Sequence, residues 1–131
     1  MSALVPVGAA TTLAMIAAMA LPPLIKQLAD MHLTALCDRR SPAELQHEIK
    51  VTYATFSNNV TITQHRTAWD NPKEWVAMKV ALLVYVPRSN IWTLYCFDRN
   101  ERRAQYPSSS TSDLASLIAE VDADPTEIIW G

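Results

Sequence analysis

The chain has 131 residues, half of them hydrophobic and 18% charged, which suits one globular domain with its own core and excludes an intrinsically disordered chain. Two glycines are too few for a glycine-rich loop that cradles phosphate groups. The net charge of −2 creates no overall field that attracts nucleic acid, so any contact with nucleic acid needs a local cluster of cations.

The N-terminal stretch is apolar, since residues 1–25 carry no charged side chain and Lys26 is the first. Its length would suffice for a transmembrane helix, and Ala18-Met19-Ala20 resembles a signal-peptide cleavage site. No basic residue precedes the apolar run, however, as a signal peptide requires. Pro6 and Gly8 interrupt the run, which argues against a spanning helix.

We therefore interpret residues 1–18 as an apolar N-terminal extension and residues 19–131 as a single α+β domain. This interpretation places the protein in the cytoplasm, and a membrane is not an expected partner. Export or membrane association through residues 1–25 is the alternative.

The first predicted helix spans residues 24–37, because Pro22-Pro23 suits a helix start and apolar residues recur at helical spacing. The expected buried stripe consists of Leu24, Leu28, His32 and Leu36. The segment 38–42 ends this helix, and Ser41 starts a short second turn of helix with capping-box spacing.

Alternating apolar and polar residues predict a strand over 49–55, a turn at Ser57-Asn58-Asn59 and a returning strand from Val60. A turn at this place suits asparagine, which tolerates positive φ. Residues 67–72 are expected to form a loop, and the longest apolar run, residues 75–86, is expected to form the central strand.

A fourth strand is predicted over 91–98 and a short fifth strand over 102–106, which Pro107 stops. The polar residues 108–112 then connect to a helix capped by Thr111 or Ser112. The apolar stripe of this helix is Leu114, Leu117, Ile118 and Val121. Strands joined by short turns pair as neighbours, so the expected fold is α+β: an N-terminal helix, a five-stranded antiparallel meander and a C-terminal helix, with both helices on one face.

The C-terminal third carries a residue pattern found in a known family. The pattern comprises Trp92-Thr93-Leu94-Tyr95, Asp98-Arg99-Asn100, Tyr106-Pro107, Asp113-Leu114 and Val121-Asp122-Ala123-Asp124-Pro125-Thr126, closing on Trp130-Gly131. Upstream, Cys37-Asp38-Arg39-Arg40 and Val60-Thr61-Ile62 fit the same pattern. From about residue 19 to residue 131 the chain resembles the domain-of-unknown-function 3024 family of small bacterial proteins. The resemblance implies no activity.

The C-terminal tail is expected to have a structural role. Pro125 ends the last helix, and an exposed Trp130 at a free end would reduce solubility. We therefore expect Ile128 and Trp130 to fold back onto the core, with Asp122 and Asp124 holding the turn. A tail that hooks a partner is the alternative, and it would leave Trp130 exposed.

The titratable residues do not form a known catalytic or metal-binding motif. The candidate metal ligands His32, His47, His65, Cys37 and Cys96 lack the spacing of a zinc site, so we predict neither a metal nor another cofactor. Cys96 alternates with core positions and is expected to be an inert buried thiol. No nucleophile motif is present, and an enzyme is the less favoured interpretation.

The second face of the sheet carries the strongest candidate binding surface. If Val76, Met78, Val80, Leu82 and Val84 face the helices, then Lys79, Ala81, Leu83 and Tyr85 face away, together with Thr93, Tyr95 and Phe97. Such a face joins aromatic rings to cations, as surfaces that bind single-stranded nucleic acid do. The candidate binding residues are Lys79, Tyr95, Phe97, Arg99 and Arg103.

The sequence thus favours a non-catalytic interaction module that forms a dimer through the open sheet face, because an uncovered apolar face often serves as an interface. A nucleic-acid-binding module that uses the basic and aromatic face is the first alternative. An enzyme of unknown class is the second. The candidate partners are therefore a second copy of the chain and nucleic acid.

Overall fold

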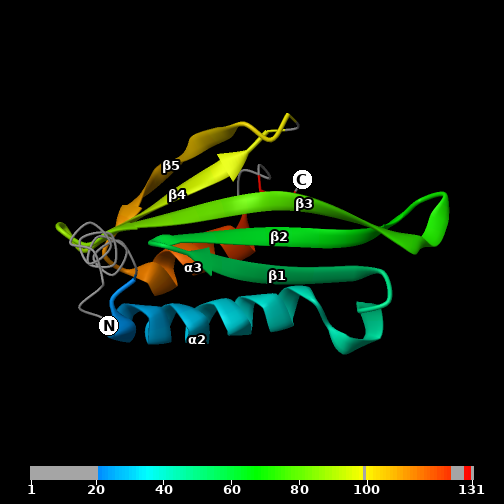
Figure 1. Cartoon of the computed structure of the whole chain (residues 1–131), viewed down its shortest axis with the longest axis horizontal. Helices are drawn as coiled ribbons and strands as arrows, with labels where there is room; N and C mark the ends of the chain where they lie inside the picture. Colours follow the sequence, from blue (N-terminus) through cyan, green and yellow to red (C-terminus); the bar gives the residue numbers. More distant parts are fainter. Residues whose placement is uncertain (1–20, 99, 125–128, 131) are drawn as a thin grey trace, which may run out of the picture.

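A computed structural model of the chain describes residues 21–98, 100–124 and 129–130 (Figure 1). The predicted extension at residues 1–18 lies outside this described part. The elements in chain order are α2 (Pro23–Arg40), the 3-10 turn η1 (Ala43–Leu45), β1 (Ile49–Phe56), β2 (Asn59–Ala68), β3 (Asn71–Val86), β4 (Ile91–Phe97), β5 (Arg103–Thr111) and α3 (Leu114–Ala123).

The five strands form one antiparallel sheet in the order β1-β2-β3-β4-β5, with β3 in the centre. Buried residues of α2 and α3 share a single hydrophobic core with residues from the sheet, such as Leu83 and Leu94. Both helices therefore cover the same face, which we call the inner face, and the opposite face is the outer face. The α+β meander predicted from the sequence is confirmed.

Helix α2 is longer than predicted, and part of its predicted buried stripe is wrong. Leu24 is 66% exposed and Leu28 is 43% exposed. The helix instead buries Ala29, Leu33 and Leu36, a row at the same helical spacing but rotated from the expected one. The buried row thus joins one small residue, Ala29, to two leucines, Leu33 and Leu36, in the shared core.

Two strands extend through segments that the sequence predicted as loops. The expected loop 67–72 shrinks to a two-residue turn, because β2 continues to Ala68 and β3 begins at Asn71. β5 continues through Pro107 to Thr111. Proline is tolerated there because β5 is an edge strand and one side of its backbone needs no partner. At the β1–β2 turn the positive φ of 57° falls on Ser57, where the sequence had suggested an asparagine.

A β-bulge in β3 changes which side chains reach the core. Ile62 of β2 pairs with Ala81, but Thr63 pairs with Lys79, so Val80 is an extra residue. Beyond the bulge, Ala81 and Leu83 therefore join the helical core together with Tyr85. The predicted orientation of Ala81, Leu83 and Tyr85 away from the helices, with Leu82 and Val84 toward them, is wrong for this reason.

Helix α3 buries all four residues of its predicted stripe, Leu114, Leu117, Ile118 and Val121. Its N-cap is Asp113, whose carboxylate accepts a hydrogen bond from the Ser116 backbone N–H at 3.3 Å, and neither Thr111 nor Ser112 caps it. At its C-terminus Asp124 adopts a left-handed conformation with φ of 42°. This conformation stops the helix and turns the chain back toward the sheet.

Candidate functional site

Four of the five candidate binding residues share the outer face. Register determines this placement, because directly opposite residues in an antiparallel pair point to the same side. Lys79 pairs with outward-facing Thr63, Tyr95 pairs with Gln105, and Phe97 pairs with Arg103. Tyr95 also lies opposite Leu82, which links β4 to the outer side of β3. The fifth candidate, Arg99, lies outside the described residues.

Cations and aromatic rings are in direct contact at two places on the outer face. The guanidinium carbon of Arg103 lies 5.1 Å from the centroid of the Tyr95 ring. The Lys50 ammonium lies 4.7 Å from the centroid of the Trp75 ring. Lys50 and Trp75 were not predicted from the sequence as members of this surface. The alternation in 49–55 was the available signal, because it places Lys50 on the side opposite buried Val51.

The outer face carries charge of one sign. The strand positions that the register places on it hold Lys50, Lys79 and Arg103, and none of the outward positions so placed holds an Asp or Glu. No ion pair joins these three cations to any described carboxylate. On the helical side, by contrast, all three described helix cations are paired, namely Lys26 with Asp30 and both Arg39 and Arg40 with Asp122.

The remaining centre of the outer face is polar. Thr61 and Thr63 on β2 and Thr93 on β4 surround the side chain of Leu82, which is only 7% exposed. Thr93 shares a hydrogen bond with Ser110 at 3.3 Å between their hydroxyl oxygens. These hydroxyl groups give the surface hydrogen-bonding capacity beside its apolar and aromatic residues.

The two cysteines have the properties of inert thiols. Burial, reinforced by the charge of Asp38, raises the pKa of Cys37 to about 11. Burial also raises the pKa of Cys96, whose thiol donates to the Ala104 carbonyl oxygen at 3.4 Å. Because only a thiolate is a strong nucleophile, neither group is activated at neutral pH. Within the described residues no cluster of three or more His, Cys, Asp or Glu side chains could hold a metal ion.

A hollow of about 260 Å³ at the N-terminal ends of α2 and α3 brings together Ser112, His32 and Asp113. These are the residue types of a nucleophilic triad, but no hydrogen bond connects any two of them among the described residues. The Asp113 carboxylate instead caps α3. A triad needs a nucleophile bonded to its base and a base bonded to its orienting carboxylate, so this hollow lacks that arrangement.

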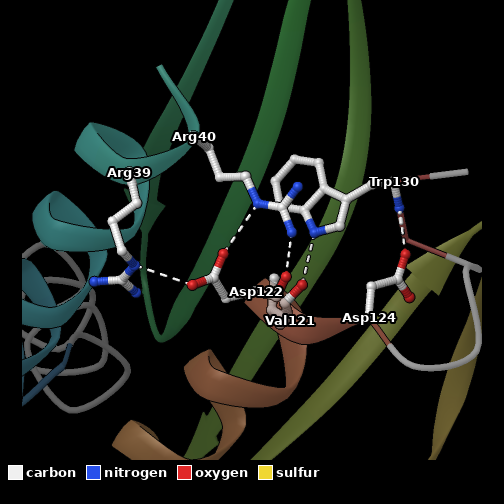
Figure 2. Close-up of polar contacts among 6 residues, drawn as sticks. All are labelled: Arg39, Arg40, Val121, Asp122, Asp124 and Trp130. Carbon is white, nitrogen blue, oxygen red and sulfur yellow. Dashed lines mark hydrogen bonds and ion pairs between the residues drawn. The ribbon is translucent and has the colours of Figure 1, made fainter. Parts of the chain in front are cut away.

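The predicted tail residues lie together at the junction of α2, α3 and the C-terminus (Figure 2). Asp122 accepts a hydrogen bond from Arg39 Nε at 3.0 Å and another from Arg40 Nε at 3.0 Å. Arg40 also donates to the Asp122 carbonyl oxygen. Asp122 therefore joins the C-terminal ends of the two helices.

Trp130 is held by three contacts in the same cluster (Figure 2). Its indole N–H donates to the Val121 carbonyl oxygen at 2.6 Å, and its backbone N–H donates to Asp124 Oδ2 at 2.8 Å. The Arg40 guanidinium carbon lies 4.3 Å from the centroid of the indole ring. Asp124 also binds the backbone N–H of Ile129, which is 5% exposed and belongs to the core. Pro125 and Ile128 lie outside the described residues.

These contacts hold Trp130 against the C-terminal ends of α2 and α3. The outer face remains the candidate binding surface. The fold defines a class, the small α+β protein with two helices on one side of an antiparallel meander. The chain belongs to the family of the domain of unknown function DUF3024, whose family model matches residues 21–131. No curated protein and no solved structure matches the chain. Across the part of the chain that the structure describes, every helix is too short or too polar to cross a membrane.

Proposed function

We propose that the protein is a non-catalytic interaction module that binds single-stranded nucleic acid through the outer face of its sheet. The observation that supports it most is the charge of that face: among the outward strand positions that the register places, the charged ones are Lys50, Lys79 and Arg103, and none has a carboxylate partner among the described residues. A polyanion would supply the missing negative charge. The net charge of −2 describes the whole chain and hides this separation.

Aromatic rings beside these cations favour a single strand over a duplex. Tyr95 and Phe97 lie on adjacent outward positions of β4, and Trp75 lies on β3. Unstacked bases can lie on such rings while the phosphates contact the cations, as on other sheet platforms. The cations that already contact Tyr95 and Trp75 would then contact both a base and a phosphate.

Dimer formation through the same face receives less support. Two copies packed outer face to outer face would bring together two sets of unpaired cations, and like charges across an interface cost free energy. Several outward positions are threonines, among them Thr61, Thr63 and Thr93, whereas the buried centre of a stable homodimer interface is mostly apolar. We therefore place binding of nucleic acid ahead of the homodimer through this face that the sequence had favoured.

The test is a salt titration of the binding of a fluorescently labelled single-stranded oligonucleotide. The expected affinity falls as salt rises, because the bound cations release counterions from the strand. Lys79→Ala and Arg103→Ala should each weaken binding and each reduce the slope of log K against log salt by about 0.7, the value for one phosphate of a single strand. Tyr95→Ala should cost about 1–3 kcal/mol if a base stacks on the ring.

The matched control is Lys26→Ala, which removes the same charge from the helical side and should leave the salt slope unchanged. If the unmodified protein shows no salt-dependent binding to any oligonucleotide, the proposal is wrong. If Tyr95→Ala instead abolishes a dimer, the outer face is a self-association surface.

A further inference from the structure

The β2–β3 hairpin reaches past β1 and both helices (Figure 1), and a hollow of about 620 Å³ lies on its inner side. We call it the hairpin hollow. Its base is formed by two directly opposed pairs of inward residues, Gln64 with Met78 and Arg66 with Val76. No described helix residue lines it, and its volume is within the range of sites for small molecules.

Gln64 carries the most deeply buried polar side chain of the hollow, because the residue is only 5% exposed. Its Oε1 accepts a hydrogen bond from Arg66 Nε at 3.2 Å. A guanidinium can only donate, so this bond fixes the orientation of the amide and turns its NH2 group away from Arg66. That NH2 group has no hydrogen-bond partner among the described residues. Buried polar groups normally have one, so Gln64 brings an unused donor to the hollow.

Arg66 adds further donors to the same base. Only its Nε takes part in the bond to Gln64, and no ion pair joins its guanidinium to a described carboxylate. Its terminal nitrogens can therefore donate to a ligand. A guanidinium presents its N–H groups as a planar fork that matches the two oxygens of a carboxylate. The two neighbouring side chains thus form a site that suits one carboxylate.

The rest of the lining decides what such a carboxylate is attached to. Val76 is 53% exposed, Met78 is 52% exposed and Trp69 is 97% exposed, so three large apolar side chains border the hollow with surface open to a ligand. Nearer the tip lie Asp70 and Glu74, and neither forms an ion pair with a described cation. These two carboxylates repel a second negative charge on the ligand. A polyanion such as nucleic acid therefore does not suit this hollow, whereas a ligand with one carboxylate and an apolar body does.

We propose that the hairpin hollow binds a small ligand that carries one carboxylate on an apolar body. The carboxylate accepts hydrogen bonds from the Arg66 guanidinium and the Gln64 NH2 group, and the apolar body lies against Val76 and Met78. Two sources share this chemistry, a free organic acid and the C-terminal residue of a peptide. The hollow lies on the opposite side of the sheet from the outer face, so this proposal does not rest on the proposed binding of nucleic acid.

The first test is a calorimetric titration of the full chain with N-acetyl-phenylalanine, which has one carboxylate and an aromatic body. N-acetyl-phenylalaninamide is the matched control, since it differs only in having a neutral amide in place of the carboxylate. We expect the acid to bind about tenfold or more tightly than the amide, because hydrogen bonds to a charged group are the stronger ones. Equal binding of the two, or no binding of either at millimolar concentration, overturns the proposal.

Phenylpropionate separates the two sources of ligand, because it keeps the carboxylate and the ring but lacks the peptide group. Binding as tight as that of N-acetyl-phenylalanine indicates a free organic acid. Much weaker binding indicates the C-terminus of a peptide, whose amide group then contributes. Both results support a carboxylate site.

Arg66→Gln tests the positive charge of the hollow. It should weaken the binding of N-acetyl-phenylalanine by about tenfold or more, since it removes the charged fork. Arg66 is an exposed residue, so the variant should fold, which far-ultraviolet circular dichroism checks. The control is Arg88→Gln, the same change in the turn between β3 and β4 and outside the hollow, which should leave binding unchanged. Undiminished binding by Arg66→Gln would show that the acid binds elsewhere.

The Gln64 side chain provides a direct readout by nuclear magnetic resonance. A nitrogen–proton correlation spectrum contains its NH2 signals, and Gln64→Leu assigns them by removing them. Saturating N-acetyl-phenylalanine should shift these signals, and the amide ligand should not. Unshifted signals while the acid binds would place the binding site outside the hollow and contradict the proposal. None of these results depends on whether an oligonucleotide binds to the outer face.

Discussion

Asp124 shows how one residue can do two structural tasks. Its φ of 42° is a left-handed conformation that aspartate adopts more readily than most residues. Its carboxylate, buried with the residue at 7% exposure, accepts hydrogen bonds from the Ile129 and Trp130 backbone N–H groups. The same side chain therefore ends α3 and anchors the tail.

Trp130→Phe should lower the free energy of unfolding by about 1–2 kcal/mol, since it removes the indole hydrogen bond to Val121 and weakens the cation–π contact with Arg40. Urea unfolding followed by circular dichroism measures this loss. Trp69→Phe is the control, because Trp69 is 97% exposed and should contribute little. Equal stability of the two variants would argue for a tail that does not dock.

At the scale of the element, the bulge at Val80 determines which side chains of β3 face the helices. Without the extra residue, alternation would point Leu82 and Val84 at the helices. With it, the strand keeps Met78 on the inner side before the bulge and Leu83 on the inner side after it. The same strand can therefore contribute to the helical core at one end and to an exposed hairpin at the other.

Two neighbouring leucines test this orientation. Leu83→Ala should cost about 2–5 kcal/mol, because Leu83 is fully buried in the helical core and leaves a cavity there. Leu82→Ala should cost less, since Leu82 lies on the outer face beside Tyr95 and Thr61, where solvent can fill the space. Chemical denaturation of both variants gives the comparison. A larger loss for Leu82→Ala would mean that the bulge is misplaced.

At the scale of the whole molecule, charge is divided between the two sides of the sheet. The helix cations are paired with carboxylates, while the outer-face cations have none among the described residues. The structural part of the family pattern, Arg39, Arg40, Asp122 and Trp130, lies at the helical junction. Stability and the proposed binding therefore use different residues.

Removing residues 1–18 should leave the fold intact. The family model begins at residue 21, so the part of the chain that carries the family pattern does not include this extension. The melting temperature of the shortened protein should therefore stay within a few degrees of the full chain, as differential scanning calorimetry can show. A collapse of soluble yield or a large fall in melting temperature would show that the domain needs this segment.

Periodicity in the sequence was sufficient to predict the fold class, because helices and strands repeat at different spacings along the chain. The buried stripe of α3 and the alternating burial of β4 were both predicted from the sequence, and the short turns between strands predicted a meander. The rotated stripe of α2 could not be predicted from the sequence, since Leu28 and Ala29 both continue an apolar pattern. Only tertiary packing determines which of the two is buried.

Three further features were decided only by tertiary structure. The bulge at Val80 leaves no local signature in a run of apolar residues, and it reversed the predicted orientation of Leu83. Lys50 and Trp75 are 25 positions apart, and they meet because β1, β2 and β3 lie side by side. β4 pairs with β3 only over residues 81–86, so the N-terminal part of β3 has one edge that no described strand covers. Local patterning determines elements, whereas the faces and edges that those elements present depend on how they pair.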